Sequence, residues 1–138
     1  MYSPSELKYT SITASYDIVV VTGTKQVEYT TENPVIMLDS QLVEKSRTTV
    51  TMGGTTMYSH ISHLNIEYIV GETLPIVAGS SYDNERNLYV FVLDHANKIF
   101  VQSSKLQIHT AAISDLKWSS HGAYWTCSQD STVRQFTV

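Results

Sequence analysis

Apolar and polar positions over the last thirty residues, from His109 to Val138, follow a pattern that predicts three short strands. The apolar segments are residues 113–118, 124–127 and 133–138, and short polar links separate them. Links of this length join antiparallel neighbours, because a parallel neighbour requires a crossover of a dozen or more residues. The pattern therefore predicts an antiparallel meander.

Two earlier stretches show the same kind of pattern. The first predicts four strands, at residues 7–12, 18–22, 27–29 and 35–38. We expect a hairpin turn at residues 23–25, where glycine begins a polar link. The second stretch also predicts four strands, at residues 61–66, 74–80, 88–91 and from residue 99 onward.

Apolar positions recur with a common spacing of three residues and then two. The three occurrences are Leu7, Thr10 and Ile12; Ile61, Leu64 and Ile66; and Ile113, Leu116 and Trp118. The second set is displaced from the first by 54 positions, and the third from the second by 52. A period near 50 with four strands in each unit is typical of β-propeller blades.

The final unit resembles a WD repeat, the blade unit of one large β-propeller family. The matching positions, in the order of the family pattern, are His109, Ile113, Leu116, Trp118, Ser119, Gly122, Ser128, Asp130, Thr132, Val133, Arg134 and Phe136. The hairpin after Trp118 is short for the family, and Phe136 replaces the usual tryptophan. The resemblance implies an all-β fold of four-stranded antiparallel blades, about three in number, in an incomplete ring.

The resemblance also implies a structural hydrogen-bonded network. In the family it joins a histidine, a serine or threonine, an aspartate and the tryptophan. Here the expected members are His109, Ser128 and Asp130, while Phe136 has no hydrogen to donate. Trp118 and Phe136 are expected to anchor the core.

Residues 39–56 do not fit the repeat and are predicted to be an insertion between the units at residues 4–40 and 57–106. A long loop on a rigid scaffold often carries contacts, so one interpretation is a partner-binding loop. The other, which we favour, is a connection with no contact role. The third unit comprises residues 107–138.

A closed propeller needs at least four blades. The remaining blades are expected from a longer chain, of which these residues would be the C-terminal part. Two alternatives are a half-ring that associates with another copy and an open assembly.

Composition narrows the choice of partner and location. Charged residues make up 16% of the 138 residues, apolar residues 42%, and the net charge is −4. This balance favours a folded sheet protein over disorder, and argues against nucleic acid and anionic lipid as partners. No glycosylation acceptor or apolar signal core is present, and the longest apolar run, residues 18–21, cannot span a bilayer. We expect a cytoplasmic protein.

Side chains that could carry chemistry have plainer interpretations. Cys127 lies in a predicted strand and is expected to be a buried, inert thiol. His60 and His63 are three apart and would face opposite sides of a strand, so they form no metal clip. Gly53 and Gly54 lack the lysine and spacing of a phosphate loop. His109, Ser128 and Asp130 resemble a catalytic set, but the family resemblance assigns them to the structural network, so we expect no catalytic residue. We also expect no cofactor and no metal.

Two functional classes remain, a non-catalytic protein-interaction scaffold and an enzyme or small-ligand-binding protein that uses the propeller channel. The second requires that Asp115, Lys117, His63 and Glu67 converge at one mouth of the channel, and we favour the first. The final repeat is also similar to a branch of double propellers that assist cofilin in disassembling actin filaments. That similarity implies actin or cofilin as the partner.

Overall fold

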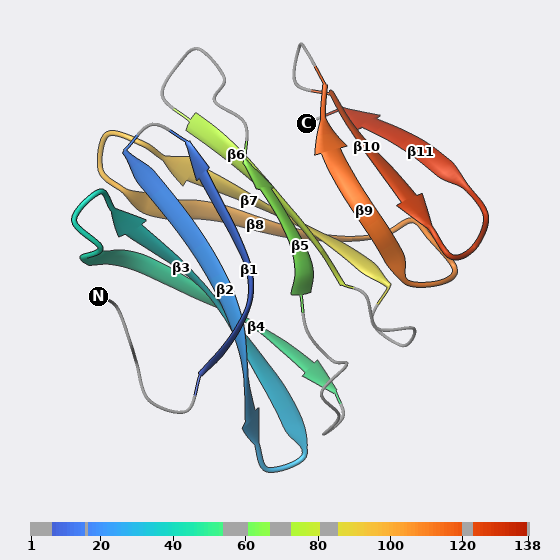
Figure 1. Cartoon of the computed structure of the whole chain (residues 1–138), viewed down its shortest axis with the longest axis horizontal. Coiled ribbons are helices and arrows are strands. Elements are labelled where there is room, and N and C mark those ends of the chain that lie inside the picture. The colour runs from blue at the N-terminus through green and yellow to red at the C-terminus, as the bar shows by residue number, and fades with distance from the viewer. Residues whose placement is uncertain are drawn as a thin grey trace.

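The computed structural model describes residues 7–15, 17–53, 61–66, 73–80, 86–119 and 123–137, and these form an all-β structure of three antiparallel sheets (Figure 1). The first sheet contains β1 (Lys8–Ser15), β2 (Ile18–Val27), β3 (Thr30–Asp39) and β4 (Glu44–Gly53). The second contains β5 (Ile61–Ile66), β6 (Thr73–Ser80), β7 (Asn87–Asp94) and β8 (Ile99–Gln107). The third contains β9 (Ile113–Trp118), β10 (Ala123–Ser128) and β11 (Val133–Thr137).

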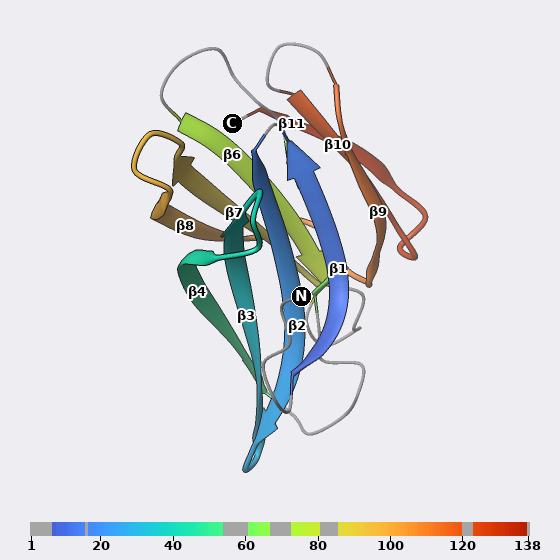
Figure 2. The ribbon, with the colours of Figure 1, turned by 60° about the vertical axis from the view of Figure 1, so that its left-hand side comes forward.

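Strand order follows chain order in every sheet, so each is a meander like a propeller blade. The inner strands β1, β5 and β9 are neighbours from sheet to sheet, and β4 contacts β8 at the outer side. Figure 2 shows β4 and β8 together on one side of the molecule and β1 and β9 on the other. No helix long and apolar enough to cross a membrane occurs among the residues that the structure describes.

The turn predicted at residues 23–25 is wrong, because β2 continues through it and reverses at residues 28 and 29. Glu28 has a φ of 53° and supplies the left-handed residue of this turn. Gly23 is instead a point of close approach, where an added Cβ would lie 2.7 Å from the carbonyl oxygen of Lys8.

The predicted insertion at residues 39–56 is also wrong. Residues 44–53 form β4, the outer strand of the first sheet. It pairs with β3 along its whole length, so that Gly53 lies opposite Thr30 at one end and Glu44 lies opposite Leu38 at the other. The connection shrinks to residues 40–43, which the Asp39 carboxylate holds by accepting hydrogen bonds from the backbone N–H groups of Gln41 (2.9 Å) and Val43 (3.0 Å).

A β-bulge recurs on every inner strand. The register skips one residue in each, namely Thr10, Ser62 and Ser114, which are 52 positions apart. A bulge places two residues opposite one, so positions three apart then share a face. The bulge therefore explains why the inward-facing apolar positions are spaced by three residues and then by two. It aligns Tyr9, Ile12 and Ala14 of β1 with Ile61, Leu64 and Ile66 of β5 and with Ile113, Leu116 and Trp118 of β9. The offset of 54 taken from Leu7 was wrong by two residues.

Two apolar clusters hold successive sheets together. The first joins the first and second sheets, with Ile18, Val20 and Met37 against Leu64 and Phe91. The second joins the second and third sheets through Leu88, Val90, Ile113, Leu116 and Tyr124. In both interfaces the apolar side chains of the later sheet's inner strand face the preceding sheet.

Candidate functional site

A buried polar network centred on His109 links the β8–β9 connection to β10 and to the β10–β11 turn. His109 Nδ1 lies 2.9 Å from Asp130 Oδ2 and 3.1 Å from Thr132 Oγ1, and Nε2 lies 2.7 Å from Thr126 Oγ1. The His109 side chain is fully buried and that of Asp130 is 5% exposed. An ionised carboxylate can only accept, so Nδ1 carries the hydrogen, and in the neutral ring Nε2 accepts from the Thr126 hydroxyl.

Asp130 organises the turn around itself. Its carboxylate accepts hydrogen bonds from the Thr132 hydroxyl, from the backbone N–H of Thr110 (3.0 Å) and from the backbone N–H of Thr132 (2.9 Å). These bonds, the Thr132 hydroxyl first, hold the pKa of Asp130 below its ordinary value despite the opposing effect of desolvation. The carboxylate therefore stays ionised and ties the two connections together.

The partner of His109 on β10 is Thr126, two residues before the predicted Ser128. The Ser128 hydroxyl donates to the backbone carbonyl groups of Ala111 (3.1 Å) or Ala112 (2.9 Å) and accepts from the Asp130 N–H (3.1 Å). Ser128 thus braces the same turn without reaching the imidazole. The alternation along β10 places both Thr126 and Ser128 on the side of Tyr124, so it limits the choice to these two hydroxyls but does not decide between them.

The two expected core anchors lie on either side of Tyr124, which is 1% exposed. Trp118 meets its ring edge-on at 5.2 Å between centroids, and Phe136 stacks on it at 5.4 Å. Trp118 Nε1 donates to the backbone carbonyl of Asn65 at 3.3 Å, which fastens β9 to β5. Both anchors are half-buried, and the fully covered member of the group is Tyr124.

The network is placed for structure and not for chemistry. Thr126 is 1% exposed and the His109 side chain is sealed, so a substrate could not reach the hydroxyl or the imidazole. A nucleophile must be accessible and must have an oxyanion site beside it. The arrangement can hold a turn in place, and it does so through polar groups that satisfy one another.

On the inner strands, the structure brings together only part of the predicted channel group. His63 Nδ1 of β5 lies 3.9 Å from Asp115 Oδ1 of β9, and both side chains are partly exposed. Lys117 is exposed two residues further along β9. Glu67 lies outside the described residues, as do His60, Gly54 and Gly122. No group of three or more metal-ligating side chains occurs within the described ranges.

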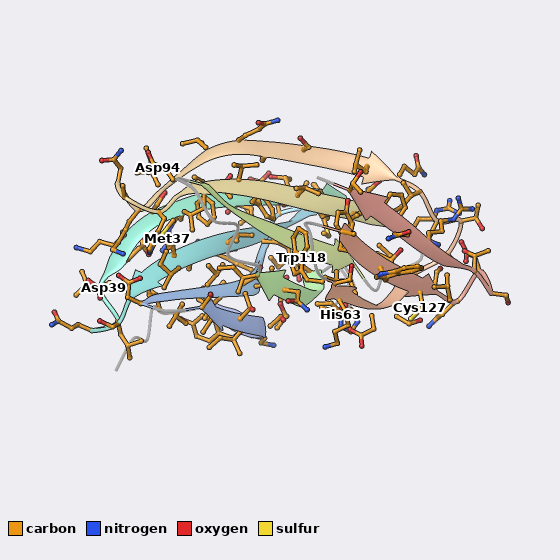
Figure 3. All side chains as sticks on the ribbon, turned by 90° about the horizontal axis from the view of Figure 1, so that it is seen from above. Met37, Asp39, His63, Asp94, Trp118 and Cys127 are labelled. Atoms are coloured by element: carbon orange, nitrogen blue, oxygen red, sulfur yellow. The ribbon has the colours of Figure 1, made fainter. Side chains whose placement is uncertain are left out.

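A second polar cluster lies where the first and second sheets meet. Asp17 Oδ1 lies 2.9 Å from His95 Nε2, and Asp17 Oδ2 lies 2.9 Å from Lys98 Nζ. These two contacts, that with His95 first, hold the pKa of Asp17 below its ordinary value. In the neighbouring turns Asp39 and Asp94 each accept hydrogen bonds from the residues that follow. Figure 3 shows Asp39 and Asp94 at the same end of the molecule.

Cys127 is half-buried, so the expectation of a buried thiol is wrong. Its sulfur lies 3.9 Å from the carbonyl oxygen of Asp115 on the face of the third sheet that points away from the second. That face has no neighbouring sheet among the described residues, which leaves Cys127 partly accessible.

Comparison with known proteins identifies no family for this chain. No protein-family model matches it, and no curated protein is significantly similar.

Proposed function

We propose that this chain is a non-catalytic protein-interaction scaffold, part of a WD-repeat β-propeller. The observation that carries the proposal is the repetition of one blade plan: three meanders in series, each with a bulge at the same place on its inner strand. The network of His109, Thr126 and Asp130 supports the proposal, because its polar groups bind one another and hold the β10–β11 turn in place.

The surface best suited to a protein partner is the end formed by residues 17, 40–43 and 95–98. Leu42 and Val43 are 41% and 49% exposed there, although both are apolar. Asp39 fixes the turn that carries them, and Leu42 has a φ of 62°. A rigid turn loses little conformational entropy on binding, so this pair offers apolar contact at low cost.

The partner that we propose is an actin filament decorated with cofilin. The basis is a resemblance in sequence pattern of residues 124–136 to the closing repeat of actin-interacting protein 1 and, more loosely, of residues 17–29 to an earlier blade of its second propeller. That protein assists cofilin in disassembling actin filaments. A partner of this kind would make the chain cytoplasmic.

Co-sedimentation with bare and with cofilin-decorated actin filaments tests the proposal. The chain should pellet with decorated filaments, and Val43→Asp should remove most of that binding. Tyr29→Asp is a matched control, because Tyr29 is 84% exposed in a turn outside this end. A chain that stays in the supernatant with both kinds of filament would refute actin as the partner.

The alternative is an enzyme or small-ligand-binding protein that uses the channel, and the contact between His63 and Asp115 is the observation in its favour. It predicts a ligand that shifts the NMR signals of the His63 ring. A single contact of 3.9 Å between two partly exposed groups makes a weaker case than the scaffold.

A further inference from the structure

The first sheet has one apolar face that no other described sheet covers (Figure 2). Val21, Ile36 and Leu38 form its centre, and Ile12 and Tyr9 on β1 are 66% and 45% exposed beside them. A groove of about 470 Å³ runs over this face, lined mainly by apolar side chains. An exposed patch of this kind marks an interaction site.

The repeat identifies what should cover this face. Ile12 is the counterpart of Leu64 and Leu116, since each stands two positions after the bulge of its inner strand. Leu64 is 9% exposed beneath the first sheet and Leu116 is 2% exposed beneath the second. In both places the preceding antiparallel sheet covers the leucine, so we expect a sheet of the same kind to cover Ile12.

Among the described residues, no sheet covers the outward face of the third sheet either, which is the face that could cover another sheet. On the third sheet, Trp125 is paired with Lys117 on the side opposite the buried Tyr124, and Cys127 is paired with Asp115 and Val133. Trp125 is 43% exposed and Val133 is 69% exposed. The corresponding face of the first sheet covers the second sheet, and the corresponding face of the second sheet covers the third.

We propose that the face of the third sheet around Trp125 and Val133 docks on the Ile12 face of a second copy of this chain. The indole of Trp125 is the side chain best suited to the groove, and large aromatic side chains are common anchors of interfaces. At the outer end of the groove the exposed pair of Arg47 and Glu44 (3.2 Å) supplies a polar rim. The contact continues the sheet-to-sheet packing already present twice within one chain.

Contacts of this head-to-tail type close into a ring when the rotation between copies allows it. Two copies with three sheets each give six, which lies within the four to eight blades of known propellers. In a closed pair each copy uses both faces, and two equivalent interfaces form at once. The expected product is a dimer and not an open fibre.

Size-exclusion chromatography with light scattering on the 138-residue chain tests this directly. The expected mass is twice that of the monomer, and Ile12→Asp and Val133→Asp should each reduce it to the monomer mass. Both side chains are largely exposed, so neither change should disturb the fold of a single copy, which circular dichroism can verify. Tyr29→Asp should stay dimeric.

Mixing the two variants separates head-to-tail docking from a face-to-itself contact. A mixture of Ile12→Asp with Val133→Asp contains one intact pair of faces, so a heterodimer should reappear. If the Ile12→Asp chain is monomeric but the Val133→Asp chain remains a dimer, then the Ile12 face packs on itself and the proposal fails. A wild-type monomer, or aggregate without a defined dimer, also overturns it.

Cys127, the chain's single cysteine, provides an independent readout because it lies on the docking face. Thiol modification should be slow at concentrations where the dimer forms, and Ile12→Asp should accelerate it severalfold. Equal rates in both proteins would contradict docking. Leu42 lines both the groove and the proposed partner surface, whereas Val43 is not part of the groove lining. Val43→Asp therefore tests the partner and Ile12→Asp tests the dimer, and a monomer that still sediments with decorated filaments would refute only the dimer.

Discussion

Thr126 offers the sharpest test of the buried network. Thr126→Val replaces the hydroxyl by a methyl group of similar size and removes the group that lies 2.7 Å from Nε2 of the fully buried His109 ring. A buried acceptor without a partner costs about 1–3 kcal/mol. The added methyl group returns roughly 0.8 kcal/mol through burial.

The net loss expected for Thr126→Val is therefore roughly 1 kcal/mol, the middle of a range of about 0.2–2 kcal/mol. For a chain of this length each kcal/mol lowers the melting temperature by roughly 4 °C, so the shift should be about 4–5 °C. Thermal melting followed by circular dichroism at neutral pH measures it. Thr51→Val is the control, since Thr51 is exposed on β4 and should change stability by less than about 0.5 kcal/mol.

A double-mutant cycle attributes the loss to His109. In a His109→Phe background the Thr126 hydroxyl has no imidazole to satisfy, so Thr126→Val should cost much less there. An equal loss in both backgrounds, or a loss in the native background no larger than that of Thr51→Val, would refute the assignment of Thr126 as the partner of His109.

Three further outcomes are expected. Gly23→Ala should cost about 1–3 kcal/mol of stability, because its Cβ would meet a backbone oxygen at 2.7 Å, whereas Gly79→Ala meets only side chains at 3.3 Å and should cost less; thermal melting ranks the two. The pKa of Asp130 is lowered in the folded state, so the unfolded chain binds more protons in acid and the free energy of unfolding falls as the pH drops below about 5. Urea unfolding at several pH values should show a smaller decrease in the free energy of unfolding for Asp130→Asn. Phe91→Ala should lose about 3–5 kcal/mol in urea unfolding, since Phe91 is 1% exposed between two sheets, while Val101→Ala on the exposed outer strand should change little.

The strands of the second and third sheets could be predicted from the sequence because their buried positions are apolar. The strand at residues 44–53 could not, since Ser46, Thr48 and Val50 take its half-buried positions and hide the alternation among small polar residues. Gly23 misled the turn prediction because glycine serves close packing as well as turns.

The candidate site was predictable in part. The order of residues located His109 and Asp130, which the structure brings to 2.9 Å. It placed the hydroxyl partner at Ser128 and not at Thr126, because the two residues lie on the same side of β10 and the sequence does not tell which of them reaches the imidazole. The contact between Asp17 and Lys98 had no sequence signal, since it joins turns that are 81 positions apart.

The bulges at Thr10, Ser62 and Ser114 are 52 residues apart, and this spacing limits which insertions and deletions keep the buried side chains of the strands in place. Deleting one residue from an inner strand would invert its buried and exposed sides and bring charged side chains such as Asp115 into the core. Duplicating a whole segment from one bulge to the next would instead preserve the phase of every strand. We therefore expect this chain to tolerate the insertion of a 52-residue segment better than the insertion of a single residue.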